Sequence, residues 1–330
     1  MRVRLSGGPA ALRIGMGMEI ASKRRTAIRH VGRARSYRLY YVLALPGLLY
    51  FLIFHYLPIF GIIIAFKDIS PFNGIIDVIQ KPFVGLKWFR QFFESYYFWQ
   101  IMRNTVIISF LKLVCVFPAS IALALLINEL RFTSLKRVIQ SISYIPHFFS
   151  MVVVAGIVMS LLTTEGGLLN QVIVSFGGQP RMFLGEPHSF RLILVMTTLW
   201  QEVGWGTIIF LAAISGIDPQ LYEAAIIDGA GRWRQTLQIT IPSITFVIVI
   251  LLIFRIGGLL NAGFEQILLL YSPQVYGVAD IIDTYVYRSG IQGMKYSFAT
   301  AVGLFKAVVA AALLLSSNYV AKRLGHTGIW

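Results

Sequence analysis

Long apolar runs separated by short polar segments dominate the chain. Six of these runs are long enough to cross a hydrocarbon core of roughly 30 Å as an α-helix. The pattern predicts an all-α membrane protein with transmembrane helices at residues 39–66, 105–126, 139–162, 190–214, 243–260 and 298–319. Pro46 and Pro58 predict kinks in the first helix. The sequence shows neither heptads nor an internal repeat.

The composition agrees with a membrane protein. Hydrophobic residues make up 57% of the chain and charged residues 13%, whereas soluble domains are roughly a quarter charged. The formal net charge is +15, but ten of the 29 Lys and Arg residues lie within residues 1–38. This distribution favours a basic, largely disordered cytoplasmic tail near membrane lipid over a nucleic-acid interface. Met1, Met16 and Met18 all remain possible translation starts.

Positive charge also orients the predicted helices. Six spans place both termini on one side, and the basic inter-helix segments fall on that same side, which is the cytoplasm under the positive-inside rule. The first outer loop is an exception, because Lys67, Lys81, Lys87 and Arg90 lie in it. Its aromatic residues predict an interfacial belt that can hold a helix flat on the membrane: Trp88, Phe89, Phe92, Phe93, Tyr96, Tyr97, Phe98 and Trp99.

A polar stretch, residues 218–242, separates the fourth and fifth apolar runs. Asp218 and Pro219 predict the start of a helix, and the glycines at positions 229 and 231 predict its end and a turn. A second short helix is expected at residues 232–239. The residues alone leave a solvated loop and a docking segment for another protein equally well supported.

This stretch resembles the EAA loop of permease subunits of ATP-binding-cassette (ABC) importers. In that family the loop is cytoplasmic, and its helix docks into a cleft on the ATPase subunit. Ile241 departs from the motif, where leucine is usual, but this exchange conserves volume. The resemblance identifies the ATPase-coupling residues as Glu223, Ala224, Ala225, Asp228, Gly229, Ala230, Ile239 and Pro242. Residues 218–242 are called the EAA-like segment below.

The resemblance extends over residues 39–330, to the oligosaccharide permeases related to the maltose permeases. It is strongest for the subgroup that handles polysaccharide-derived oligosaccharides, including acidic ones such as alginate fragments. It implies a type I importer permease domain in the bacterial inner membrane, with a second related permease subunit, two ATP-binding subunits and an external solute-binding protein as partners. Further stretches carry it: Leu45-Pro46, Asn104-Thr105, Tyr144-Ile145-Pro146 and residues 166–170.

Enzymatic motifs are absent from the sequence. It contains no phosphate-binding G-x-x-x-x-G-K-[ST] run, so we expect ATP and Mg²⁺ only on the partner ATPase subunits. The five histidines are scattered, and Cys115 is the single cysteine, so no metal site is predicted. An ion-coupled secondary transporter would need paired carboxylates within the spans or inverted repeats, which the sequence does not show. A scaffold that binds a soluble partner through the EAA-like segment remains an alternative.

Polar residues inside the spans supply the candidate solute path, because burying them is costly and they usually face a cavity or a partner. Equivalent helices line the translocation path in the sugar importers that the chain resembles. The candidates are Thr198, Glu202 and Trp205 on one face of the fourth span, with Arg255 and Asn261 in and beside the fifth. Trp205 can stack on a sugar ring.

A structural Glu202–Arg255 pair explains two of these residues equally well. Lys112 and Lys306 also lie within spans, where snorkelling or a contact with the partner subunit is favoured over a transport role. His147 is interpreted as a structural histidine rather than a proton relay.

Overall fold

The computed structural model describes residues 37–326 and 328–329. The predicted tail, residues 1–38, lies almost entirely outside the described residues. The chain divides into two units, Met1–Ile62 and Ile63–Trp330.

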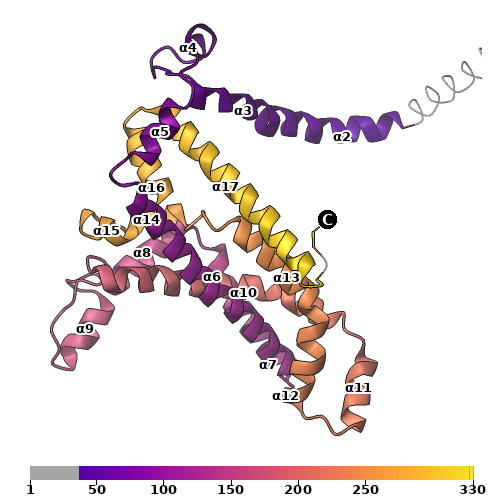
Figure 1. Cartoon of the computed structure of the whole chain (residues 1–330). Helices are drawn as coiled ribbons and strands as arrows, with labels where there is room; N and C mark the ends of the chain where they lie inside the picture. Colours follow the sequence, from indigo (N-terminus) through magenta and orange to yellow (C-terminus); the bar gives the residue numbers. More distant parts are fainter. Residues whose placement is uncertain (1–36, 327, 330) are drawn as a thin grey trace, which may run out of the picture. The chain divides into compact units, whose positions relative to one another are not determined.

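The described part of the first unit is a helical run (Figure 1). It contains α2 (Arg38–Phe51), the π-helical η1 (Leu52–Tyr56), α3 (Leu57–Ile59) and the start of the 3₁₀-helical η2 (Phe60–Phe66). α2 continues through Pro46, whereas the π turn lies directly before α3, whose Pro58 lacks the N–H for a helical hydrogen bond. Tyr40–Phe66 is long and apolar enough to cross a membrane, which confirms the first predicted span.

In the described part of the second unit, four further helical runs are long and apolar enough to cross a membrane (Figure 1). They are α6 (Phe98–Glu129), α10 (Pro187–Ser215), the run Arg232–Gly257 and α17 (Tyr296–Arg323). They confirm four of the predicted spans. Three of these helices extend beyond the predicted span at both ends, and the run Arg232–Gly257 begins before it.

The third predicted span is not one continuous helix. α7 (Thr133–Tyr144) and the 3₁₀ turn η3 (Ile145–Phe148) are followed by α8 (Met151–Leu162), and the two parts meet at an angle of 101°. Pro146 starts the 3₁₀ turn, and the side chain of Ser150 caps α8 by accepting from the backbone N–H of Val153 at 3.4 Å. A proline followed by a new N-cap therefore breaks the helix where hydropathy indicated a single span.

The predicted helix at residues 232–239 is not separate from the fifth span. α12 (Arg232–Gln235), the π-helical η4 (Thr236–Thr240) and α13 (Ile241–Gly257) form one run. Pro242 lies in the first turn of α13, where the π turn before it accommodates the missing N–H. The run ends at Gly257, earlier than the predicted residue 260.

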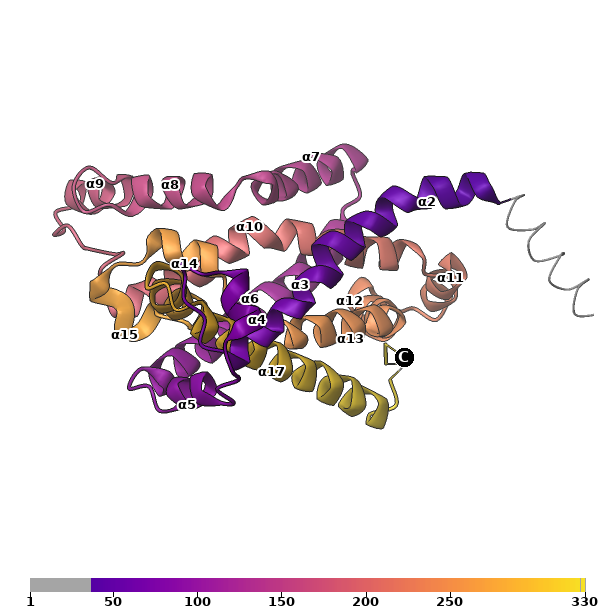
Figure 2. The same ribbon diagram turned by 90° about the horizontal axis from the view of Figure 1, so that it is seen from above.

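α6 and α10 pack against each other along the centre of this unit, and α7 and α8 follow one side of α10 (Figure 2). Gly204 and Gly206 of α10 permit the close approach. A Cβ atom on Gly204 would lie 2.0 Å from the Ser143 carbonyl oxygen of α7, and one on Gly206 would lie 2.6 Å from Ser120 Oγ of α6. Small residues thus set the spacing of the helices around α10.

The predicted aromatic belt is only partly at the surface. Short helix α5 (Lys87–Phe93) carries Phe92, which is buried and packs edge-on against Phe98 with ring centroids 5.1 Å apart. Phe298 of α17 belongs to the same cluster. Tyr96 and Trp99 remain exposed. The belt prediction is therefore wrong for Phe92 and Phe98, because helix packing takes these rings into the core.

Short elements complete the unit. Between α13 and α17 lie α14 (Phe264–Leu270), η5 (Pro273–Val275), α15 (Tyr276–Ala279), α16 (Ile282–Val286) and η6 (Tyr287–Gln292). Three others are α4 (Ile75–Gln80), α9 (Leu168–Ser175) and α11 (Pro219–Ile227). The core cluster around Ile108, Leu194 and Ile267 joins α6, α10 and α14, and α14 thereby becomes one wall of the site described next.

Candidate functional site

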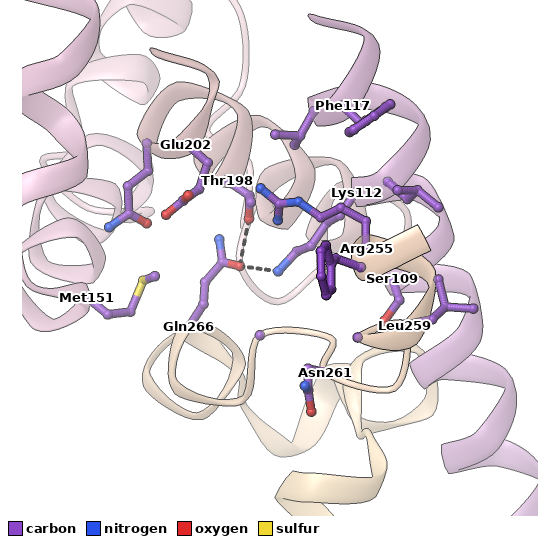
Figure 3. A pocket seen from close by; sticks show the side chains of 16 residues that line it. Ser109, Lys112, Phe117, Met151, Thr198, Glu202, Arg255, Leu259, Asn261 and Gln266 are labelled. Atoms are coloured by element: carbon purple, nitrogen blue, oxygen red, sulfur yellow. Dashed lines mark hydrogen bonds between the residues drawn. The ribbon is translucent and has the colours of Figure 1, made fainter. Parts of the chain in front are cut away.

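A cavity of about 490 Å³ lies between α6, α8, α10, α13 and residues 258–266 (Figure 3). Four of the five predicted path residues line it: Thr198, Glu202, Arg255 and Asn261. Ser109, Lys112, Gln201 and Gln266 add further polar groups to the lining. The structure therefore brings side chains from distant parts of the sequence around one polar space within an apolar helical unit.

The fifth predicted path residue, Trp205, does not line this cavity. Its indole stacks on the His147 imidazole, with ring centroids 4.3 Å apart and an angle of 6° between the planes. His147 Nδ1 lies 3.3 Å from Glu202 Oε1. The break between α7 and α8 places His147 beside α10, so the imidazole covers one face of the Trp205 ring.

The predicted Glu202–Arg255 pair is not formed. Glu202 pairs with His147 instead, and within the described residues Arg255 forms neither an ion pair nor a hydrogen bond. Its guanidinium group points into the cavity (Figure 3). Arg255 therefore offers its donors to the cavity rather than to Glu202.

Lys112 is a site residue that the sequence interpretation missed. It neither snorkels nor faces outward, because its Nζ donates to the Ala262 carbonyl oxygen at 2.8 Å and to Gln266 Oε1 at 2.6 Å. Placing a charge at the centre of a membrane helix costs roughly 3 kcal/mol on insertion scales. A lysine in the middle of the long apolar run of α6 was thus the available signal that this face of the helix borders a polar space.

Gln266 had no comparable signal, because residues 261–270 fall outside every predicted helix. Its side chain is 1% exposed and accepts hydrogen bonds from Lys112 and, at 3.1 Å, from Thr198 Oγ1 (Figure 3). Its Nε2 donates to the Leu194 carbonyl oxygen at 3.1 Å. Only the packing of α14 against α10 brings this amide to the cavity.

Gly263 gives the Lys112 ammonium group its space. Its φ angle is +93°, and a Cβ atom there would lie 2.5 Å from Lys112 Nζ. Glycine adopts this left-handed backbone without strain. The loop between α13 and α14 can therefore pass directly against the charged group.

The remaining predicted path residue, Asn261, also contacts a second lysine. Its Oδ1 accepts from Lys306 Nζ at 3.3 Å, and Lys306 forms an ion pair with Asp283. Both groups hold the Lys306 ammonium group inside the second unit, so Lys306 does not snorkel.

A polar network fixes the segment between α14 and α17. Arg288 Nη2 contacts Asp280 Oδ2 at 2.7 Å, and its Nη1 contacts Oδ1 at 3.1 Å. The Asp280 side chain is buried, and its hydrogen bonds to Arg288 raise the pKa of that guanidinium. Asn104 of α6 donates to the backbone oxygens of Gly277 and Asp280, both at 3.1 Å. These contacts therefore fix the segment that follows α14 against α6.

The EAA-like segment begins as its residues predict. Asp218 Oδ1 accepts from the Gln220 backbone N–H at 3.0 Å, and Pro219 opens α11. After α11 the backbone turns at Gly229, whose φ is +74°, and the Ala230 N–H donates to the Ala225 carbonyl oxygen at 2.8 Å. This is a glycine-terminated helix end. The predicted N-cap and turn are both confirmed.

α11 buries none of its side chains in this chain. Ile227 is 86% exposed and Trp233 of α12 is 80% exposed. Glu223, Ala224, Asp228 and Gly229 are exposed as well, while Ala225, Ala230 and Ile239 are half-buried and Pro242 is exposed. The segment therefore presents a small, largely uncovered helix in which apolar and acidic groups lie next to each other.

Contacts at its base join the EAA-like segment to the long helices. Arg232 Nη1 donates to the Glu129 carbonyl oxygen at 3.2 Å and pairs with Glu129 Oε2 at 3.1 Å, at the end of α6. Tyr222 Oη lies 2.9 Å from Thr240 Oγ1, at the start of the fifth span. A force applied to α11 can therefore reach α6 and α13, two of the helices around the cavity.

This architecture, a set of apolar helical runs around an internal polar cavity, is that of a membrane transport subunit. The chain belongs to the family described as binding-protein-dependent transport system inner membrane component, whose model matches residues 116–326. It is a multi-pass permease subunit of an ABC importer, and ATP hydrolysis in this family is carried out by separate subunits.

Two curated relatives from Bacillus subtilis (strain 168) are each 47% identical to this chain over 290 residues. The alignment with protein LplB covers 88% of this chain and 90% of LplB. The alignment with the polygalacturonan/rhamnogalacturonan transport system permease protein YteP covers 88% of this chain and 89% of YteP.

Among solved structures, the chain is similar to a subunit of a bacterial ABC transporter involved in the import of the acidic polysaccharide alginate. The identity is 40%, the TM-score is 0.82, and the match covers 89% of this chain and 99% of that one. The predicted type I importer permease fold is confirmed by this likeness.

Proposed function

We propose that this chain forms half of the translocation path for an oligosaccharide delivered by an external solute-binding protein. The polar cavity between α6, α10, α13 and α14 is the observation that carries the proposal, because hydroxyl-rich solutes need hydrogen-bonding groups inside an otherwise apolar helical unit. The names of similar permeases, which include polygalacturonan/rhamnogalacturonan and arabinooligosaccharides, support a carbohydrate as the solute.

The second half of the path belongs, in this proposal, to a related permease subunit, and two ATP-binding subunits carry ATP and Mg²⁺. One of them docks on the EAA-like segment, with Glu223 and the exposed apolar residues of α11 at the contact. The segment and both termini then lie in the cytoplasm, as the distribution of basic residues indicates. Exposed apolar surface beside an acidic group supports such a docking site.

Alternating access supplies the mechanism. Closure of the ATPase dimer around ATP moves α11, and the contacts of the segment with α6 and α13 transmit the movement to helices that line the cavity. ATP can favour the outward-facing state only through contacts that differ between the two states, because equal binding to both would shift nothing. The EAA-like segment is a mechanical coupler in this scheme.

Co-purification tests the proposal. The tagged chain, extracted in mild detergent, is expected to bring down a second permease and an ATP-binding subunit in stoichiometric amounts. Glu223→Arg should remove the ATP-binding subunit and leave the second permease, because it reverses an exposed charge at the proposed contact. Glu165→Arg is the matched control, since Glu165 is another exposed glutamate that lies outside the segment.

Two results would contradict the proposal. If the chain purifies alone, the proposed importer assembly is wrong. If Glu223→Arg and Glu165→Arg retain the ATP-binding subunit equally, the proposed docking role of α11 is wrong. Uptake of a labelled oligosaccharide by proteoliposomes that contain the assembled complex, supplied with its binding protein and ATP, tests the solute class directly.

A further inference from the structure

We propose that Lys112 and Arg255 form a binding site for a carboxylate group of an acidic oligosaccharide inside the cavity. This inference rests on the proposed function and names its substrate class, an oligosaccharide that contains uronic acid. It assigns the recognition of charge to two residues of this chain rather than leaving it entirely to an external binding protein.

The first argument is the charge balance of the cavity lining. Its ionisable residues are Lys112, Arg255 and Glu202. The only carboxylate, Glu202, points to His147 and contacts neither cation. Two cationic groups therefore border one cavity, and neither forms an ion pair with a carboxylate of the described residues. A ligand that brings a negative charge would supply the missing partner.

The second argument is the hydrogen bonding of Lys112. An ammonium group has three N–H donors and no acceptor. Two of the donors go to neutral oxygens, those of Ala262 and Gln266, and the third has no acceptor among the described residues. These neutral contacts, with Gly263 directly against Nζ, orient the ammonium group without neutralising it.

The third argument is the state of Arg255. A guanidinium group presents five donors in a planar arrangement that matches the two oxygens of a carboxylate. Within the described residues none of these donors is used, and the group points into the cavity that Thr198 and Lys112 also line (Figure 3). Thr198 and Lys112 share Gln266 as an acceptor, so this hydroxyl and this ammonium group lie together in the lining of the cavity that Arg255 also lines.

A purely structural role for Lys112 is the competing explanation, since Lys112 also ties α6 to the loop that follows α13. That role predicts a loss of stability and of all transport when Lys112 is changed. It predicts nothing for Arg255, which has no contact to lose in the described chain. An anion site predicts a loss for both residues that is confined to acidic solutes, and this difference makes the two explanations separable.

The test measures direct binding of sugar to the assembled importer, purified in detergent without nucleotide, by equilibrium dialysis. One probe is labelled trigalacturonate, and the other is the same trisaccharide after its carboxyl groups have been reduced to alcohols. Arg255→Gln and Lys112→Gln are each expected to weaken trigalacturonate binding about ten- to hundredfold, the usual range for hydrogen bonds to charged groups. Binding of the reduced trisaccharide should stay within about twofold of the wild type.

Arg255→Lys is the intermediate variant, because it keeps the charge but loses the planar pair of donors, and it should weaken trigalacturonate binding less than Arg255→Gln does. Equal binding of both trisaccharides by the wild type, or equal weakening of both by the variants, would overturn the carboxylate site and leave the carbohydrate function standing. A wild-type complex that binds neither trisaccharide would overturn both the site and the proposed oligosaccharide solute.

Discussion

The EAA-like segment and the cavity differ in which side chains they expose and which they bury. The segment exposes apolar side chains, such as Ile227 at 86% and Trp233 at 80%, whereas the cavity encloses polar ones, such as Gln266 at 1% exposed. Each arrangement is unfavourable for the isolated chain, because exposed apolar groups seek a partner and enclosed polar groups must be satisfied. Both departures from the ordinary distribution therefore mark places where the chain acts on something else.

The two regions also differ in how they are built. Residues 218–242 are contiguous, and their local geometry depends on a cap at Asp218 and a turn at Gly229. The cavity takes its polar residues from α6, α10, α13, α14 and the loop before α14. Local sequence therefore controls the first region and long-range packing controls the second, and the predictions below separate these two kinds of control.

The largest expected effect distinguishes a buried isoleucine from an exposed one. Ile267→Ala removes packing from the fully buried core beside the cavity, and we expect it to cost about 2–5 kcal/mol of stability. Ile227→Ala should stay within about 0.5 kcal/mol but weaken association with the ATP-binding subunit. Thermal unfolding in detergent and co-purification measure the two effects. Similar destabilisation by both changes would contradict the expectation that the core beside the cavity depends on packing and α11 does not.

Next in size is the helix spacing that frames the cavity. Gly204→Ala places a methyl group 2.0 Å from the Ser143 backbone oxygen, and we expect about 2–3 kcal/mol of destabilisation. Gly303→Ala is the control, because a Cβ atom at that helical position meets nothing within 4 Å. Unfolding midpoints of the two purified variants provide the comparison. If the midpoint of Gly204→Ala matches that of the control, close packing of α10 is not what sets the frame.

A moderate effect is expected at the turn of the EAA-like segment. Gly229→Val forces a β-branched residue into a backbone with φ of +74°, which should misdirect the end of α11 and lower solute-stimulated ATP hydrolysis tenfold or more. Gly231→Val is the matched control, since that φ is −70° and a Cβ atom there meets nothing within 4 Å. Equal activity of the two variants would show that local geometry does not control coupling.

The smallest expected effect is at the contact between the segment and α6. Arg232→Ala removes an exposed ion pair with Glu129, and such pairs contribute at most about 1 kcal/mol. We expect little change in the unfolding midpoint but a measurable drop in solute-stimulated ATP hydrolysis, because the contact joins α11 to a cavity helix. A large loss of stability with unchanged ATP hydrolysis would show that the Arg232–Glu129 contact stabilises the fold and does not take part in coupling.

The spans and the EAA-like segment were predictable from sequence because their signals are local. Hydropathy reports whether about twenty neighbouring residues can sit in lipid, and caps and glycine turns act within a few residues. Hydropathy could not show the break at Ser150, because an average over about twenty residues does not register a local interruption of the helix. It also could not place Phe92 in the core, since an aromatic ring suits either the membrane interface or a packed cluster.

The cavity depended on tertiary structure. The sequence singled out Thr198, Glu202 and Arg255 inside apolar spans and Asn261 beside one, and all four line the same cavity. Helix packing decides which groups these residues contact. The bend after α7 places His147 beside Glu202, and α14 places Gln266 beside Lys112. Burial cost is a property of one residue and its neighbours in sequence, whereas the identity of a partner depends on which helices meet.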